Sequence, residues 1–314
     1  MKTTKLFFMA ALALMTAACS NDDNDFGQQP AEQAANGEIT ITATVSSDEG
    51  ATTRALSIDG SNIASTWETT DKFAILYNDG TSDVKREATV SSINGSTVTI
   101  TFTIPSSLAN NTACKIVYPA SAANAANTGA DVAKELATQD GTIGNCPEVR
   151  VGTATIDKDN HSLSNVTKLE AQNAIFKFTT KNSGGTATID VNSLTVTTGG
   201  QDYVITPASA TSELYVALPP ISSQEVTFTA TGSDSKTYTA SKASVTFSAG
   251  KYYQSNIKLT EQVPALNLTS PAVGQVIGDD GMNYDYASLP GGVTAVAMIC
   301  YVSGSNGLAL ALAD

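Results

Sequence analysis

Apolar and polar residues alternate along most of this chain with a period of two, the pattern of β-strands that bury one face. The clearest run is 96–104, in which four large apolar residues alternate with threonines. The same alternation occupies 38–45, and its apolar members are Ile39, Ile41, Ala43 and Val45. Further strands are predicted at 73–77, 114–118, 174–179, 193–197, 213–218, 225–229, 244–247 and 252–259.

Turn-forming residues separate these runs. Asn94-Gly95 lies between 87–93 and 96–104 and predicts a hairpin. Many short strands at this spacing predict an all-β fold of sandwiches or barrels. One short helix is predicted around 130–138, within a stretch (121–150) that lacks alternation and is expected to be a long surface loop. The return of alternation at Val166 predicts a domain boundary near 165, and 261–267 is a predicted linker.

The N-terminus predicts export from the cytoplasm. Residues 1–18 combine two lysines, a short apolar run and small residues before Cys19, which is typical of a signal peptide. The Ala17-Ala18-Cys19 junction resembles a bacterial lipobox, where cleavage leaves an acylated cysteine at the new N-terminus. The alternative is an ordinary secreted protein with a leftover cysteine. Residues 19–37 form an acidic, polar tether that resembles the surface-export signal of Bacteroides-type lipoproteins, although a plain tether is the simpler interpretation.

Composition and charge exclude several classes of function. The net charge is −13, and an acidic chain repels the phosphate backbone of nucleic acids. His161 is the only histidine and lies in a polar turn, so a histidine-based catalytic set or a zinc site cannot be assembled. We therefore predict no enzymatic activity, no catalytic residue, no metal and no cofactor.

The remaining cysteines and the C-terminal region leave alternatives open. Cys114 and Cys146 could pair in the periplasm, or these two and Cys300 could be three buried free thiols. Residues 268–314 form a partial module, and a calcium loop at 279–285 is less favoured than a turn because its spacing does not fit. The last run, 307–313, is apolar on both faces, which predicts a strand inside a fold. The hypothesis drawn from it is that the chain is a fragment of a longer protein.

Three groups of residues together resemble the fimbrillin family, the subunits of type V pili. The resemblance covers residues 37–260 and is carried by 52–56 (Thr-Thr-Arg-Ala-Leu) with 67–75, by 174–178 (Ala-Ile-Phe-Lys-Phe), and by 250–253 (Gly-Lys-Tyr-Tyr) with 256–259. It implies two tandem antiparallel β-sandwich domains of Greek-key-like topology, at 38–165 and 166–260. It also implies a lipid-anchored outer-membrane protein with a structural or adhesive role in a fimbrium.

The resemblance implies a mechanism of assembly as well. A protease would cut between Arg54 and Ala55, and strand 38–45 would be lost together with the lipid. A strand from another subunit would then fill the groove by strand addition. The simpler interpretation of Arg54 is an exposed loop charge. The chain departs from the family after residue 260, where the extra module would suit a tip subunit.

The alternative function is a monomeric surface adhesin or glycan-binding lipoprotein that does not polymerise. Sugar-binding surfaces usually expose aromatic rings, whereas Trp67 is the only tryptophan and most other aromatic residues fall at core-facing positions. A ligand on a host or bacterial surface is compatible with both functions. Processing at Arg54 followed by strand exchange would separate them.

Overall fold

The structure is a computed structural model that describes residues 37–47, 57–59, 62–64, 67–124, 129–262, 266–304 and 306–312. Cys19, Arg54 and Ala55 lie outside these residues, as do the predicted signal peptide and most of the tether. Almost all regular elements are β-strands, which confirms the all-β prediction. None of the helices in the described ranges is long and apolar enough to cross a membrane.

The first sheet is eight-stranded, with the order β10-β1-β6-β5-β4-β7-β9-β11. Its strands are β1 (Glu38–Ser46), β4 (Lys72–Asn78), β5 (Asp83–Asn94), β6 (Thr97–Pro105), β7 (Thr112–Tyr118), β9 (Arg150–Asp157), β10 (Ser162–Ser164) and β11 (Glu170–Ala171). Strand β10 also pairs with β9, so the sheet curls round until β1 and β9 meet the same short strand. The predicted hairpin at Asn94-Gly95 is confirmed by the antiparallel pairing of β5 and β6.

The alternation seen in the sequence places one face of this sheet in a core. On β6, Val98, Ile100 and Ile104 are buried or nearly so, while the intervening threonines are only partly covered. At another part of the core, the ring of Trp67 lies 5.2 Å from that of Phe73 and 5.2 Å from that of Tyr118, measured between centroids. A two-stranded hairpin, β2 (Ser57–Asp59) with β3 (Asn62–Ala64), lies between β1 and β4 in the sequence.

The second sheet is also eight-stranded, with the order β15-β12-β18-β17-β16-β13-β14-β8. Its strands are β8 (Thr138–Gln139), β12 (Ala174–Asn182), β13 (Val191–Thr198), β14 (Gln201–Ile205), β15 (Glu213–Leu218), β16 (Ile221–Gly232), β17 (Thr237–Phe247) and β18 (Tyr252–Glu261). Strands β17 and β18 pair only at one end, so the sheet splits there into two faces that enclose a core. Phe176 and Phe178 lie in this core, with stacked rings 5.1 Å apart.

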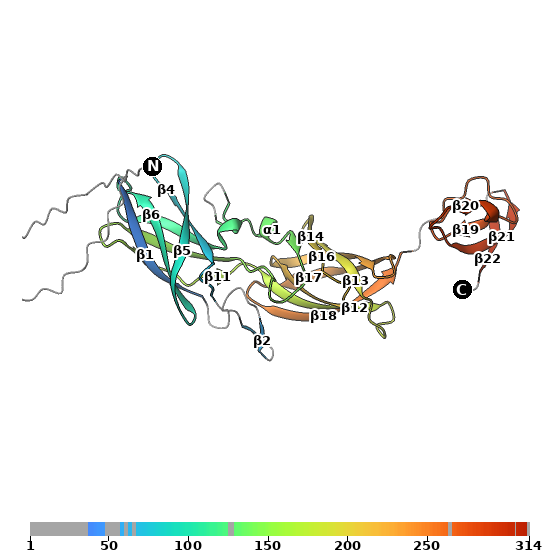
Figure 1. Cartoon of the computed structure of the whole chain (residues 1–314), viewed down its shortest axis with the longest axis horizontal. Coiled ribbons are helices and arrows are strands. Elements are labelled where there is room, and N and C mark those ends of the chain that lie inside the picture. Colours follow the sequence, from blue (N-terminus) through green and yellow to red (C-terminus); the bar gives the residue numbers. More distant parts are fainter. Residues whose placement is uncertain are drawn as a thin grey trace, which may run out of the picture. The chain divides into compact units, whose positions relative to one another are not determined.

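Pairing in the second sheet is not wholly antiparallel. Strands β12 and β18, which carry two of the sequence motifs described above, form a long parallel ladder from Ile175 opposite Tyr252 to Asn182 opposite Leu259. Strand β8 also pairs in parallel with β14, although β8 lies within the range predicted for the N-terminal domain. The predicted domain limits remain predictions. Apart from β8, sheet membership along the chain changes between β11 and β12 (Figure 1).

The expectation of a long surface loop at 121–150 is wrong. This segment contains η1 (Ala120–Ala122) at its start, α1 (Val132–Glu135) and β8, and its Leu136 and Val149 side chains are fully buried. Gln139 is buried too: its Oε1 accepts a hydrogen bond from the Ala217 backbone N–H at 2.8 Å, and its Nε2 donates to the Ala217 carbonyl at 2.8 Å. The short helix predicted at 130–138 is confirmed, with Asp131 accepting a hydrogen bond from the Lys134 N–H at its N-cap.

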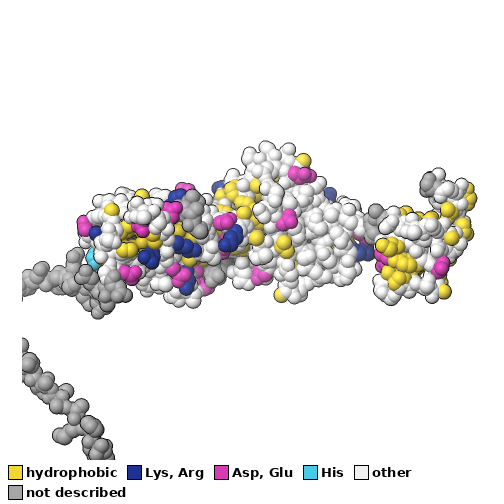
Figure 2. All heavy atoms as spheres, turned by 90° about the horizontal axis from the view of Figure 1, so that it is seen from above, with side chains coloured by type: hydrophobic (Ala, Val, Ile, Leu, Met, Phe, Trp, Pro, Cys, Tyr) yellow, Lys and Arg dark blue, Asp and Glu magenta, His cyan; other side chains and the backbone are white. Residues whose placement is uncertain are grey.

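The C-terminal module is a small sheet with the order β20-β19-β21-β22. Its elements are β19 (Val276–Gly278), β20 (Asn283–Tyr284), η2 (Tyr286–Ser288), β21 (Ala295–Ser303) and β22 (Asn306–Ala311). The last strand was expected to lie inside a fold, but it is an edge strand whose Leu308 and Leu310 are 61% and 62% exposed. Figure 2 shows hydrophobic side chains gathered on the surface of this module.

Candidate functional site

Strand β1 has the apolar face that the sequence predicts for a displaceable strand. Ile41 and Val45 are 0% and 1% exposed, Ala43 is buried, and Ile39 is partly buried. These side chains alternate with threonines because successive residues of a strand point to opposite faces. The four residues therefore lie together on the core side of the first sheet.

The two edges of β1 are held very differently. On one edge β1 pairs with β6 along its whole length, from Glu38 opposite Pro105 to Ser46 opposite Thr97. On the other edge, β10 pairs with it only at Thr42, whose N–H donates to the His161 carbonyl at 3.0 Å. A further bond joins the Leu169 N–H to the Ser46 carbonyl at 2.8 Å. Strand β1 is therefore almost an edge strand, although its side chains lie in the core.

His161 contributes to this edge through its backbone. Its φ is +51°, a left-handed conformation in the turn that precedes β10, and this turn presents the carbonyl to β1. The sequence predicted a surface turn at this position. No local pattern indicates that this turn touches β1, because the residues lie far apart along the chain and only the curling of the sheet brings them together.

The proposed processing site lies in the connection that follows β1. Arg54 and Ala55 are outside the described residues, between the end of β1 and the β2–β3 hairpin. Cleavage there would separate β1 from the rest of the chain, because β1 comes first among the described strands. The cut after Arg54 and the anchor at Cys19 stay predictions.

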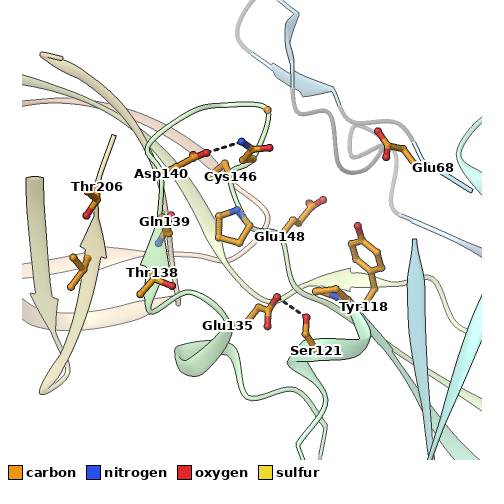
Figure 3. A pocket seen from close by; sticks show the side chains of 15 residues that line it. Glu68, Tyr118, Ser121, Glu135, Thr138, Gln139, Asp140, Cys146, Glu148 and Thr206 are labelled. Atoms are coloured by element: carbon orange, nitrogen blue, oxygen red, sulfur yellow. Dashed lines mark hydrogen bonds between the residues drawn. The ribbon is translucent and has the colours of Figure 1, made fainter. Parts of the chain in front are cut away.

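A cavity of about 870 Å³ lies beside the segment 118–148 (Figure 3). No local pattern indicates it, because its walls come from β7, η1, α1, β8 with the segment that follows it, β14 and the segment before β4. The residues that line it are Glu68, Tyr118, Pro119, Ser121, Glu135, Thr138, Gln139, Asp140, Gly144, Asn145, Cys146, Pro147, Glu148, Val204 and Thr206.

Hydrogen bonds hold the acidic side chains of this cavity in place. Glu135 accepts a hydrogen bond from the Ser121 hydroxyl at 2.8 Å, and Asp140 accepts from Asn145 Nδ2 at 2.6 Å. Burial alone would raise the pKa of Asp140, but bonds from the backbone and hydroxyl of Thr142 and from Asn145 bring it below its ordinary value. Asp140 is therefore ionised at neutral pH.

The three cysteines of the described residues, whose pairing the sequence leaves undecided, are free thiols. Cys114 and Cys146 are both buried, in the cores of different sheets, and Cys300 is partly exposed. Burial raises the pKa of Cys114 to about 12. Burial also raises the pKa of Cys146, and the charges of Glu148 and Asp140 raise it further. A protonated, buried thiol is a poor nucleophile and a poor metal ligand.

Trp67 and the acidic groups of the described residues bear on the sugar-binding and metal-binding alternatives. Trp67 is 4% exposed and packs in the core, so it offers no surface for stacking a sugar ring. No group of three or more His, Cys, Asp or Glu in the described ranges is arranged to hold a metal ion. Asp280, within the stretch 279–285, accepts a hydrogen bond from the Met282 N–H in a turn.

No protein-family model matches this chain, and no curated protein matches it in sequence. Among solved structures, a protein from Bacteroides uniformis provisionally assigned to cell adhesion is 16% identical, covering 73% of this chain and 98% of its own, with a TM-score of 0.38. A fimbrial assembly protein from Parabacteroides distasonis is 10% identical, covering 70% and 90%, with a TM-score of 0.38. A second provisional cell adhesion protein, from Bacteroides eggerthii, is 10% identical, covering 71% and 86%, with a TM-score of 0.35. TM-scores below 0.5 do not establish a shared fold, so the function proposed below rests on the strand pairing of this chain.

Proposed function

We propose that this chain is a non-enzymatic, structural or adhesive component of a surface fimbrium, assembled by exchange of strand β1. In this proposal Cys19 carries the lipid anchor in the outer membrane, a protease cuts after Arg54, and β1 leaves. A strand from another subunit then takes its place. The observation that carries the proposal is the asymmetry of β1, which pairs with β6 along its whole length on one edge and is held at only a few points on the other.

This asymmetry suits a strand that must be replaced. Removing β1 breaks one complete ladder, with β6, but the rest of the sheet keeps its own pairings because β6 still pairs with β5. The groove left behind would have the unpaired edge of β6 along one side and the core as its floor. An incoming extended segment can satisfy both, with backbone hydrogen bonds to the edge and apolar side chains at every second position.

The cost of an empty groove explains why replacement would follow removal. Fully burying an Ile or Val side chain contributes about 1.5–3 kcal/mol, so Ile41 and Val45 together contribute roughly 3–6 kcal/mol, and the partly buried Ile39 adds to this. Native domains are stable by only about 5–15 kcal/mol. A subunit that has lost β1 is therefore close to unfolding, and it gains most of that energy back when another strand enters.

Limited proteolysis tests the proposal directly. The full chain, purified in mild detergent, is treated briefly with trypsin, and the new N-terminus is read by intact mass. Oligomers are followed on a denaturing gel without boiling. We expect a new N-terminus at Ala55, loss of β1 and a ladder of oligomers. Arg54→Gln should abolish all three, whereas Arg86→Gln, on β5, should leave them unchanged.

A synthetic peptide with the sequence of residues 37–47 provides a second measurement. Added in excess to cut protein, it should bind the empty groove and suppress the ladder, and a peptide carrying Ile41→Asp should do neither. If Arg54 resists trypsin while other sites are cut, the monomeric surface adhesin becomes the better interpretation. If the cut occurs but β1 stays bound, and neither ladder nor peptide binding is seen, strand exchange is refuted.

A further inference from the structure

Residues 136–149, called the strap below, lie in the sequence between β7 and β9 of the first sheet, yet they pair with the second sheet. Within the strap, β8 extends the second sheet beyond β14. The Val204 N–H donates to the Ala137 carbonyl at 2.8 Å, and the Thr206 N–H donates to the Gln139 carbonyl at 2.9 Å. One edge of the strap therefore covers the backbone edge of β14.

The strap also reaches β15, which stands at the opposite end of the strand order of the second sheet. The Tyr215 N–H donates to the Gly141 carbonyl at 2.8 Å. The buried Gln139 side chain accepts a hydrogen bond from the Ala217 N–H and donates one to the Ala217 carbonyl, both at 2.8 Å. The strap thus bridges the two ends of the sheet and provides partners for backbone groups that are buried there.

Side chains of the strap belong to the core of the second sheet. Leu136 and Val149 are 0% exposed, and Cys146 is 7% exposed. All three pack in the core that the second sheet encloses. A segment that lies between two strands of the first sheet in the sequence is therefore built into the second.

The same core continues onto the first sheet through β4, which is buried on both faces. Phe73, Ile75 and Tyr77 lie in the first core, whereas Ala74 and Leu76 lie in the core that contains the strap. The two cores therefore share a strand. Unfolding of the first sheet would expose apolar surface of the second core to water, which is unfavourable.

The end of the strap is fixed to the connection between the two sheets. The Val149 N–H donates to Oδ1 of the buried Asn173 at 2.8 Å, and the Val149 carbonyl accepts from the Gln172 N–H at 2.7 Å. The Asn173 carbonyl accepts from the Gly250 N–H at 2.9 Å, just before β18. These bonds anchor the start of β9, at Arg150, to the second sheet without involving β1.

We propose that the strap joins the two sheets into one cooperatively folded unit, so that the second sheet keeps the first one folded while its groove is empty. Strand β1 leaves from beside β6, whereas β4, β7 and β9 keep their pairings with one another and stay attached to the second sheet. A chain that has lost β1 is close to unfolding, so this coupling decides whether the groove persists until another strand enters. The role in assembly rests on the strand exchange proposed above.

Undocking β1 in the uncut chain tests this role without a cut at Arg54, so resistance of Arg54 to trypsin would refute only the processing step. Ile41→Asp places a charge at a fully buried position and should expel β1 from the core, as checked by hydrogen exchange of residues 38–46. The full chain in mild detergent is then treated with iodoacetamide at pH 8 without denaturant, and peptide masses report labelling of Cys114 and Cys146. We expect both thiols to resist. Reaction of Cys114 would show that the first sheet does not survive without β1, which overturns the proposal.

Matched glutamine variants measure the coupling itself. Gln139→Ala removes the side-chain bonds of the strap to Ala217, and Gln201→Ala changes an exposed residue of β14, the strand that the strap covers. Unfolding in urea is followed by the fluorescence of Trp67, which lies in the first core. We expect Gln139→Ala to raise the unfolding equilibrium constant reported by Trp67 by about tenfold or more, with or without Ile41→Asp. Gln201→Ala should raise it by no more than about twofold.

Two results in urea would contradict this coupling. If Gln139→Ala makes Cys146 reactive at lower urea but leaves the Trp67 curve unchanged, the two sheets unfold separately. If Gln139→Ala and Gln201→Ala shift the Trp67 curve equally, the bonds of the strap to Ala217 do not couple the sheets. Because the comparison of the two glutamine variants is also made in the chain that retains Ile41, it does not depend on how Ile41→Asp folds.

Discussion

Shortening one buried side chain of β1 tests whether this strand is held by its side chains in the core or only by its backbone pairing. Ile41 is 0% exposed and lies opposite Phe102 in the centre of the ladder with β6. Ile41→Ala removes three carbon atoms from a packed core, which costs about 2–5 kcal/mol in lost burial and in the cavity that remains. Thr42→Ala is the matched control, because Thr42 is the next residue, its side chain is exposed, and only its backbone N–H bonds to His161.

The full chain measures the cost for folding. In urea, monitored by Trp67 fluorescence, Ile41→Ala should lower the free energy of unfolding of the first sheet by about 2–5 kcal/mol. Thr42→Ala should lower it by less than about 1 kcal/mol, since exposed strand positions differ by no more than that. Trp67 is a suitable probe because it is buried in the core to which β1 contributes.

The cut chain measures the cost for strand release. Once the connection after β1 is cleaved, β1 is held only by its contacts, so the lost energy appears in its rate of dissociation. A loss of 2–5 kcal/mol corresponds to roughly 30- to 4,000-fold faster release. Competition with labelled 37–47 peptide gives that rate. Equal effects of Ile41→Ala and Thr42→Ala in both assays would show that the β1 side chains do not hold it in the groove.

Three further predictions concern groups elsewhere in the sheets. Burial raises the pKa of Cys114 to about 12, so the contribution of this protonated thiol to folding stability is present below about pH 9 and falls as the pH rises towards 12. Native protein should therefore resist iodoacetamide at pH 8, whereas urea-unfolded protein should react, as read by intact mass. Tyr118→Phe removes the hydroxyl that donates to buried Asp71 at 3.0 Å and should cost about 1–3 kcal/mol in urea unfolding. Gly141→Ala should cost more than about 1 kcal/mol, because φ is +75° and the new Cβ would lie 2.6 Å from a core side chain. Gly95→Ala, with φ +58° and open space around it, should cost less and isolates the steric part.

The sequence by itself determined the local structure of the strands. The side chains of a strand alternate between two faces, so the buried face of β1 and β6 can be identified from their threonine alternation before any partner is known. The hairpin at Asn94-Gly95 was equally local, because that dipeptide favours the positive φ that Gly95 adopts. The short helix was predicted for the same reason, since its N-cap and its residues are neighbours in the chain.

Only the tertiary structure decided how these strands meet. The parallel ladder of β12 with β18 joins residues more than seventy positions apart, and no periodicity records the direction of a distant partner. Segment 121–150 has no alternation, yet Leu136 and Val149 are buried because other elements close over them. The carboxylates of the cavity come from the segment before β4, from α1 and from the segment after β8, and no local pattern indicates that these segments meet. The weak outer edge of β1 likewise depends on where the sheet curls, a long-range property that local sequence patterns do not contain.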